Sequence, residues 1–470
     1  MKTLKVVAIY GIGLVFCKLV GLALQPYVTS HLGLENYGKL DVLLVLTTLL
    51  SLLISLGVID GLYRFCHDES QPERLLGQAL WQVSLCGFIL TGLLLFFSPQ
   101  LQPLLPGPPP LFAFNCFLLM IFFNALNAIP LAKLRIDNNA KCFVTIQIII
   151  ALVQAGLILY LVRSWDVNGI AMAGLIAQII GSLLLYPQWP KPNFSINKTL
   201  LKYGAVLTIS GLLGFISLGA ERWAIAHYLG VDAVSPYAIA MQWGVAASLL
   251  IEPFSLWWFP KRFSLVNTEE QKQQLANITI LACQLCILIA AAIILFGPTF
   301  LRFWLEPTFH YSSILIPFIA LWLMLKGCCT FLNVGCYYHE HGKGILMINS
   351  LSTLLSLFVF IYILPMFDIL VLVYCGIGIQ ALRLVIFYLY SQHHLPLSYP
   401  LPSLFLSLAL ITFICFCQQY QFTFLLFLLT ALLCIQVYWP WRHYCHYRNL
   451  LREFRHDQNK ASSDCFLGNH

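Results

Sequence analysis

Long apolar runs, each about as long as a membrane-crossing helix, recur along the whole sequence. A hydrocarbon core about 30 Å thick requires about 20 residues of α-helix to cross it. Short stretches rich in Pro and polar residues separate the runs, as in PQLQPLLPGPPP at 99–110. We therefore predict an all-α polytopic membrane protein with fourteen transmembrane helices. They are expected at 6–29, 40–62, 76–98, 111–131, 142–162, 169–186, 200–220, 236–259, 275–297, 312–337, 345–364, 368–390, 402–418 and 422–440.

The sequence contains too few charged residues to cover a water-facing surface. Of the 470 residues, 60% are hydrophobic and only 10% are charged, and the mean hydropathy is +0.82. Soluble domains carry about 25% charged residues. The net charge of +7 is scattered over short loops, so nucleic acid is not an expected partner. The sixteen cysteines lie mostly within apolar runs, where a thiol behaves as a small hydrophobe, and we predict neither a metal site nor a cofactor.

The distribution of Lys and Arg predicts the orientation of these helices. The first run is too long for a signal peptide and is interpreted as the first membrane helix. With the N-terminus in the cytoplasm, nineteen Lys and Arg residues fall on the cytoplasmic side and four on the outer side. Cytoplasmic loops of membrane proteins carry such an excess. Both termini are therefore predicted to be cytoplasmic.

A phrase near the start of the chain is echoed about two hundred residues later. Tyr10-Gly11 opens the first predicted helix, and HLGLENYGKLDV follows it at 31–42. Tyr203-Gly204 opens the seventh, and HYLGVDAVSPYAIA follows it at 227–240. A repeat of six helices returns the chain to its starting side, so the two copies would run in parallel. We predict two six-helix lobes facing a central cavity (1–199 and 200–395), two extra helices (396–441) and a cytoplasmic amphipathic tail (442–470).

The same segments resemble the polysaccharide-lipid (Wzx-like) oligosaccharide flippases of the MOP superfamily, which also contains the MATE drug exporters. The resemblance rests on GIGLVFCKLVGLALQPYVTSHLGLENYGKLDV at 11–42 and on LLKYGAVLTISGLLGFISLGAERWAIAHYLGVDAVSPYAIAM at 200–241. It covers roughly residues 1–395. The usual Asp of the Asp-Arg pair after the seventh helix is Glu221 here, which keeps the charge.

The resemblance implies a transporter, not an enzyme, in the inner membrane of a bacterium. Its substrate would be an undecaprenyl-diphosphate-linked oligosaccharide, moved from the inner to the outer leaflet by alternating access. The product would serve the biosynthesis of a surface polysaccharide such as O-antigen lipopolysaccharide, capsule or exopolysaccharide. The implied partners are this lipid-linked substrate, membrane lipid and other polysaccharide-assembly proteins, and we expect a monomer.

Basic residues inside the predicted helices are the main candidates for a substrate site. A Lys or Arg at a helix centre costs about 2.5–3.5 kcal/mol on insertion, so an ionisable residue there is a functional hypothesis by default. Lys18 and Lys326 fall near mid-span, where they are too deep to reach the surface easily. We predict that they line a cationic cavity that holds the diphosphate. Arg222 and Arg383 are expected to contribute.

Acidic residues and prolines in or beside the same helices are the remaining candidates. The carboxylates could couple transport to protons or sodium, or could pair locally with Arg. Polar residues follow the Lys18 face of the first helix, and a proline beyond them is expected to bend that helix. The coupling candidates are Glu221, Glu252, Asp41 and Asp60, and the gating candidates are Gln25, Pro26 and Pro253.

Two other functions stay open at this stage. A MATE-type Na⁺/H⁺-coupled multidrug exporter would place carboxylates in its cavity, whereas the mid-span candidates here are mainly basic. A membrane-embedded glycosyltransferase or polymerase would need a sizeable outer loop, and the longest predicted outer loop has about fifteen residues. No Walker A, H-E-x-x-H or G-x-S-x-G motif occurs in the sequence.

Overall fold

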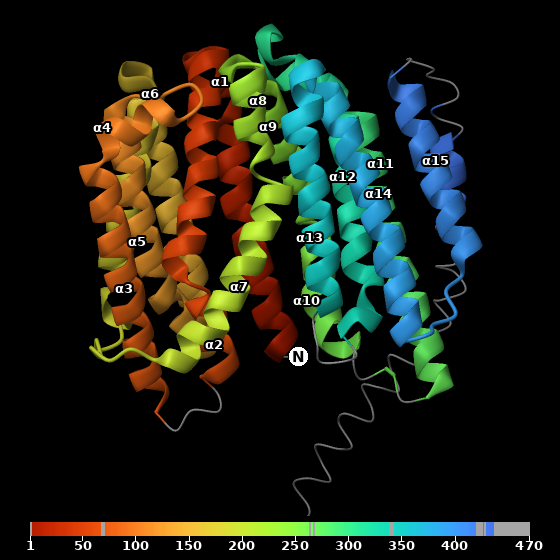
Figure 1. Cartoon of the computed structure of the whole chain (residues 1–470), viewed down its shortest axis with the longest axis horizontal. Helices are drawn as coiled ribbons and strands as arrows, with labels where there is room; N and C mark the ends of the chain where they lie inside the picture. Colours follow the sequence, from red (N-terminus) through yellow and green to blue (C-terminus); the bar gives the residue numbers. More distant parts are fainter. Residues whose placement is uncertain are drawn as a thin grey trace, which may run out of the picture.

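The computed structural model of the chain is a bundle of long helices that run side by side (Figure 1). It describes residues 2–66, 71–262, 265–266, 268–337, 343–419, 426 and 429–436. The predicted tail at 442–470 lies outside the described residues, and so does most of the predicted span at 422–440. Within the described part every regular element is helical, which confirms the predicted all-α class.

The first half of the chain forms one side of the bundle and the later helices form the other (Figure 1). The early helices are α1 (Lys2–Ser55), α2 (Val58–Phe65), α3 (Pro72–Phe96), α4 (Ser98–Leu101), α5 (Leu111–Ile136) and α6 (Ala140–Leu184). The later helices are α7 (Lys198–Ser217), α8 (Glu221–Tyr228), α9 (Val231–Ser248), α10 (Glu252–Lys261), α11 (Glu269–Trp304), α12 (Tyr311–Leu332), α13 (Lys343–Phe358), α14 (Ile369–His394) and α15 (Leu401–Gln419).

Ten stretches of the described chain are long and apolar enough to cross a membrane, and two of them can cross it twice. The stretch Ile9–Ser55 has 47 residues, which as one straight helix would measure about 70 Å. The backbone leaves the helical region at Gly33 in α1 (φ 67°, ψ −176°) and at Asp166 in α6 (φ 46°, ψ −127°). Each long element is therefore two membrane-length helices joined at a sharp turn.

The two Leu-Gly turns of the repeated phrase lie close together, at the end of the bundle opposite the N-terminus. Both Gly33 (φ 67°) and Gly230 (φ 90°) adopt the left-handed conformation that glycine permits. Gly38, one turn after Gly33, lies so close to the backbone carbonyl of Val231 that a side chain would clash there. Both copies of the repeated phrase therefore turn at a glycine, and the structure brings the two copies into contact.

Local capping explains where several helices begin. The Asn197 side chain accepts a hydrogen bond from the Leu200 backbone N–H at 3.0 Å and so begins α7. Thr268 and Gln271 form a reciprocal capping box at the start of α11. Such caps satisfy amide groups that have no partner in the first helical turn.

Helix α7 contacts both sides of the bundle. Near its start, Gly204 lies against Gly57 with no room for a side chain on either residue. Near its end, Ser217 shares a hydrogen bond of 2.8 Å with Thr353 of α13. Figure 1 shows α7 slanting from one side towards the other. The predicted boundary near residue 200 thus falls at a helix that packs against both predicted lobes.

Candidate functional site

Lys18 lies on the face of α1 that is directed towards the second half of the chain. Gln25, two helical turns further along the same face, contacts α9, whereas Tyr27 on the opposite face contacts α6. The Lys18 side chain is exposed, and a side chain added at Gly21 would meet nothing within 4 Å. No other side chain therefore covers α1 at Lys18 and Gly21.

Lys326 and Arg383 belong to two adjacent helices of the second half, α12 and α14. The Lys326 side chain is exposed, and the charges of Arg383 and Glu221 act on it. Arg383 is half-buried and donates to the Asn349 side chain of α13 at 2.8 Å. The structure thus places Lys326 and Arg383, two of the four predicted cations, near each other.

Neither predicted lysine is neutralised in the part of the chain that the structure describes. Among the described residues, no carboxylate oxygen of an Asp or Glu lies within 4.0 Å of the ammonium group of Lys18 or Lys326. An exposed cation without a fixed counter-ion remains available to an external anion. Their assignment to a substrate site stays a prediction.

Arg222, by contrast, is held in an ion pair that joins the two halves of the chain. Its Nη1 lies 3.3 Å from Oδ1 of Asp41, whose side chain is only 1% exposed. The neighbouring Glu221 is also buried and accepts hydrogen bonds from the backbone N–H of Gly219 and from the hydroxyl of Tyr237. Of the acids predicted as possible local partners of an arginine, Asp41 is the one that forms an ion pair with Arg222.

A second set of interactions between the halves surrounds Gln25. Its amide nitrogen donates to Oε1 of Gln242 at 2.9 Å and to the Tyr37 hydroxyl at 3.2 Å. Its amide oxygen accepts from the Trp243 indole at 2.6 Å. The sequence singled out Gln25 but not Gln242, whose only signal is an amide within an apolar run.

The side-chain hydrogen bonds between the first half and helices α8–α15 are confined to one region. Among the described residues, all of them join residues 25–42 to residues 222–243. They lie towards the end of the bundle opposite the N-terminus, where α1 turns at Gly33 (Figure 1). We call this end the closed end, because side-chain hydrogen bonds hold the two halves together there.

The other predicted site residues lie away from this junction. Asp60 and Glu252 are exposed, on α2 and at the start of α10. Within the described chain neither has a basic partner within 4.0 Å. The side chain of Pro253 lies outside the described residues.

The expected bend at Pro26 is not where α1 breaks. Pro26 lies within α1, and the backbone leaves the helical region only at Gly33. Neighbouring helices allow a membrane helix to tolerate an internal proline. The predicted bend at Pro26 stays a prediction, and the sharp turn of α1 follows seven residues later, at Gly33.

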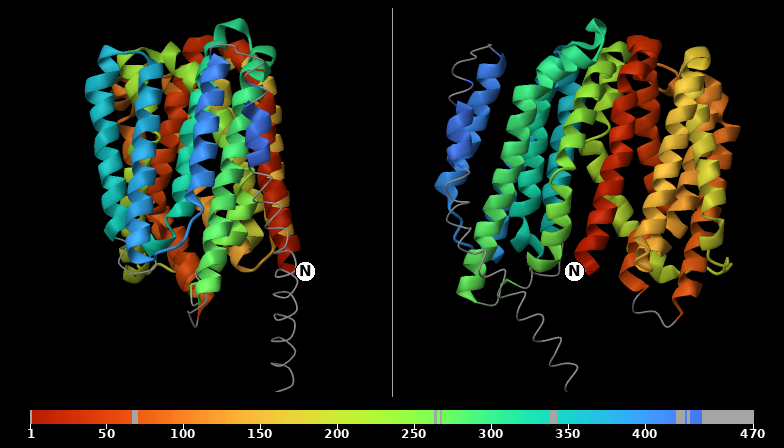
Figure 2. Two further views of the ribbon diagram at one scale, coloured as in Figure 1. Left: turned by 90° about the vertical axis from the view of Figure 1, so that its right-hand side faces the viewer. Right: turned by 180° about the vertical axis from the view of Figure 1, so that it is seen from behind.

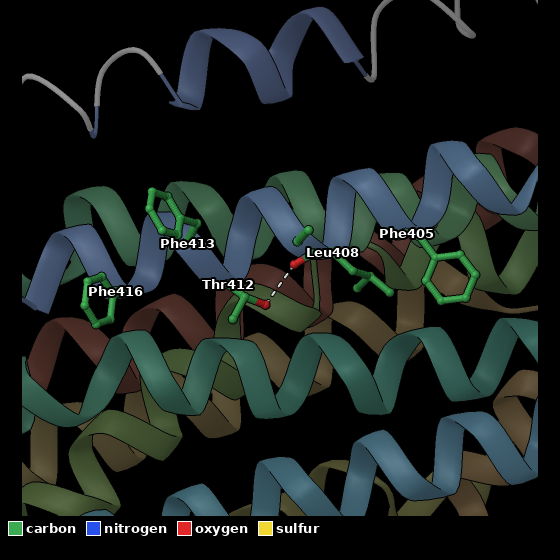
Figure 3. A pocket seen from close by; sticks show the side chains of 6 residues that line it. Phe405, Leu408, Thr412, Phe413 and Phe416 are labelled. Carbon is green, nitrogen blue, oxygen red and sulfur yellow. Dashed lines mark hydrogen bonds between the residues drawn. The ribbon is translucent and has the colours of Figure 1, made fainter.

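A separate apolar groove runs along α15 at the edge of the bundle. It is lined by Phe405, Leu408, Ala409, Thr412, Phe413 and Phe416. Figure 3 shows these side chains, with the Thr412 hydroxyl bonded to the carbonyl of Leu408 at 2.8 Å. Helix α15 packs against α11 and α12, at the periphery in the views of Figure 2. None of the predicted charged residues lines this groove.

Long membrane-crossing helices in two groups form a multi-pass membrane fold. Comparison with solved structures shows that transporters of the MOP superfamily share this fold. The lipid II flippase MurJ in an inward closed conformation matches with a TM-score of 0.70 and 13% identity, covering 94% of this chain and 99% of that one. An inward-facing MATE multidrug transporter matches with a TM-score of 0.63 and 15% identity over 80% and 94%. A Pyrococcus furiosus MOP transporter, described as having a binding pocket of reversed polarity, matches with a TM-score of 0.55 and 15% identity over 83% and 95%.

The chain belongs to the polysaccharide biosynthesis protein family, whose model matches residues 3–266. The solved transporters share its fold, and the predicted transporter role belongs to the proposed function. The resemblance to MOP-superfamily transporters is confirmed as well. A comparison with curated proteins finds no match in sequence.

Proposed function

We propose that this protein flips undecaprenyl-diphosphate-linked oligosaccharides from the inner to the outer leaflet of a bacterial inner membrane. The observation that carries this proposal is the exposed, unneutralised Lys18 on the α1 face directed towards the second half. Lys326 adds a second such cation, with Arg383 nearby. The family match to polysaccharide biosynthesis supports the same substrate class.

The barrier to unaided crossing comes from the polar parts of the substrate. Each sugar hydroxyl left unpaired in hydrocarbon costs several kcal/mol, and the diphosphate charge costs far more. A wet cavity that opens to one side at a time removes this barrier. Lysine ammonium groups would hold the diphosphate as point charges. With the cell interior negative, outward movement of each negative charge gains about 2.3 kcal/mol per 100 mV.

The proposed topology has fourteen membrane helices, two parallel six-helix lobes and both termini in the cytoplasm. The double crossings of α1 and α6 support this number, together with the 19-to-4 distribution of basic residues. The end that carries the N-terminus is then cytoplasmic, and the hydrogen-bonded end is the outer one. The described conformation would therefore be closed to the outside.

The groove of α15 is proposed to contact a lipid chain. Its lining is apolar, and its single hydroxyl is already bonded within the helix. A prenyl tail in such a groove would stay in a hydrocarbon-like environment while the head group crosses the cavity. The two helices after residue 395 would then serve the lipid part of the substrate.

The test is export of surface glycan in a strain that lacks the gene. The strain is complemented with wild type, Lys18→Ala, Lys18→Arg or Lys326→Ala, each at a verified membrane level. Lys39→Ala is the matched control, because Lys39 already pairs with Glu35 at 2.5 Å. We expect loss of export with both cavity Ala variants, recovery with Lys18→Arg and normal export with Lys39→Ala. Normal export by both Lys18→Ala and Lys326→Ala would exclude the cationic site.

A MATE-type exporter of cationic drugs is the second candidate. It is favoured by the similarity of fold to MATE transporters and by the buried acid Asp41. Under this alternative, deletion of the gene would increase susceptibility to cationic drugs and leave surface glycan intact. The same strains tested for both properties separate the two functions.

A further inference from the structure

Uncharged side chains orient Arg383 of α14. Its Nη2 donates to Oδ1 of Asn349 on α13 at 2.8 Å, and its Nη1 donates to Oε1 of Gln380, one turn earlier on α14, at 3.3 Å. Its Cζ lies 5.1 Å from the centre of the Phe387 ring. Amide oxygens and an aromatic face can orient a guanidinium without cancelling its charge. These three contacts therefore fix the position of Arg383 and leave its positive charge in place.

Lys326 lies on the face of α12 that packs against α14. One turn before it, Trp322 packs over Gly376, where an added side chain would lie 2.7 Å from the indole. Three residues after it, the Cys329 thiol donates to the backbone carbonyl of Gln380 at 3.8 Å. These two flanking side chains are 4% and 2% exposed, whereas the Lys326 side chain is exposed. Lys326 is therefore the accessible position between two packed ones.

The accessible side of Lys326 is directed towards the interior of the bundle. Helix α12 packs against α9, α11 and α14 (Figure 1). The charge of Glu221, which is buried at the junction between the halves, acts on Lys326, and so does the charge of Arg383. Lys326 and Arg383 thus lie near each other on the inner side of the second half. Their like charges repel each other, and an anion that contacts both would stabilise the pair.

We propose that Lys326 and Arg383 together hold the diphosphate group of the substrate, and that Asn349 is the residue that positions Arg383 for it. The nature of the substrate rests here on the proposed function. A diphosphate offers two adjacent anionic groups, one for the ammonium and one for the planar donors of the guanidinium. Because Arg383 is already oriented before the anion arrives, less conformational freedom is lost on binding.

The amide at position 349 is the specific feature of this arrangement. An aspartate there would have the same shape, would accept the same hydrogen bond from Arg383 and would form a stronger, charge-assisted contact. It would also neutralise the guanidinium and compete with the diphosphate. A purely structural contact would be served at least as well by aspartate. An asparagine suits a residue that orients Arg383 without competing for its charge.

The test measures the binding of two probes, inorganic pyrophosphate and farnesyl diphosphate. Titration calorimetry is carried out on the purified full chain in nanodiscs of zwitterionic lipid, and thermal unfolding is recorded for every variant. The variants are Asn349→Asp, Asn349→Ala, Arg383→Met and the double variant Asn349→Ala with Arg383→Met. Ser356→Ala is the matched control, because Ser356 lies two turns further along the same face of α13 and donates within that helix to the Ser352 carbonyl at 2.9 Å.

We expect Asn349→Asp to unfold at or above the wild-type temperature and yet to bind both probes about tenfold more weakly, as for the loss of one hydrogen bond to a charged group. Asn349→Ala should also weaken binding. This effect should vanish in the Arg383→Met background, because Asn349 acts through Arg383. Ser356→Ala should bind as wild type. Tighter binding of farnesyl diphosphate than of pyrophosphate would assign the site to a lipid head group, and equal binding would assign it to the diphosphate alone.

Three results would overturn the proposal. They are wild-type affinity in Asn349→Asp, an effect of Asn349→Ala that persists in the Arg383→Met background, and a wild type that binds neither probe. If the aspartate variant does not fold, Asn349→Ala and its double variant decide the question.

The outcome is separable from that of the proposed function. If deletion of the gene leaves surface glycan intact but Asn349 controls diphosphate binding, the site stands and the flippase does not. If export requires Lys18 but Asn349→Asp binds diphosphate as wild type, the flippase stands and the positioning role of Asn349 does not.

Discussion

Gln25 and Gln242, separated by 217 residues, share a hydrogen bond of 2.9 Å between the two halves of the bundle. The Trp243 indole donates to the same Gln25 side chain at 2.6 Å. This uncharged network lies beside the ion pair of Arg222 and Asp41. Together they close the end of the bundle that lies opposite the N-terminus.

Removing the Gln25 amide should loosen the closed end. In Gln25→Ala the half-buried Trp243 indole loses its acceptor, while Gln242 still accepts from the Tyr37 hydroxyl. A buried group left unsatisfied costs about 1–3 kcal/mol, which is an upper bound for this half-buried indole. We expect a lower unfolding temperature in lipid nanodiscs and faster amide hydrogen exchange in residues 25–42. Gln273→Ala, which removes an exposed amide on α11, serves as control and should change neither.

Removing the Arg222 guanidinium should be the most damaging change at the junction. Arg222→Met leaves Asp41 and Glu221 as two buried acids without a cation, and breaking a buried ion pair in this way costs about 3–5 kcal/mol. Thermal unfolding should show a large loss of stability. The double variant Arg222→Met with Asp41→Asn should recover part of it, and absence of any recovery would mean that the two residues are not coupled.

The crossing of α7 against the first half should tolerate no side chain at Gly204. Gly204→Ala would bring a methyl group against the backbone carbonyl of Leu56, and such overpacking typically costs about 1–3 kcal/mol. Gly214→Ala is a control on the same helix, because nothing lies within 4 Å of the added carbon. Its effect should be neutral or stabilising by up to about 1 kcal/mol. Equal unfolding temperatures for the two variants would contradict the described packing.

Binding of a polyprenyl diphosphate should depend on Lys18 and on salt. Loss of one cation that contacts the diphosphate is expected to weaken binding about tenfold, which corresponds to about 1.4 kcal/mol. Added salt should weaken wild-type binding and reduce the difference, because it screens exposed charges. Titration calorimetry of the purified protein measures both effects. The matching polyprenyl alcohol, which lacks the diphosphate, is the control ligand, and its binding should depend on neither Lys18 nor salt.

The sequence by itself determined the membrane class, the approximate helix positions and the glycine turns. These features depend on local rules: an apolar run of sufficient length must span lipid as a helix, and a left-handed turn favours glycine. The turns at Gly33 and Gly230 and the double length of α1 and α6 follow from such rules. The turn at Gly33 falls between the predicted spans 6–29 and 40–62.

Only the tertiary structure decided which charges are paired. Lys18, Lys326 and Arg222 look alike in sequence, yet Arg222 alone meets a carboxylate at 3.3 Å, from a residue 181 positions away. The sequence also does not predict that α7 contacts both sides of the bundle or that Gln25 pairs with Gln242. Helix periodicity tells which residues share a face, but the neighbour of that face depends on how all the helices pack.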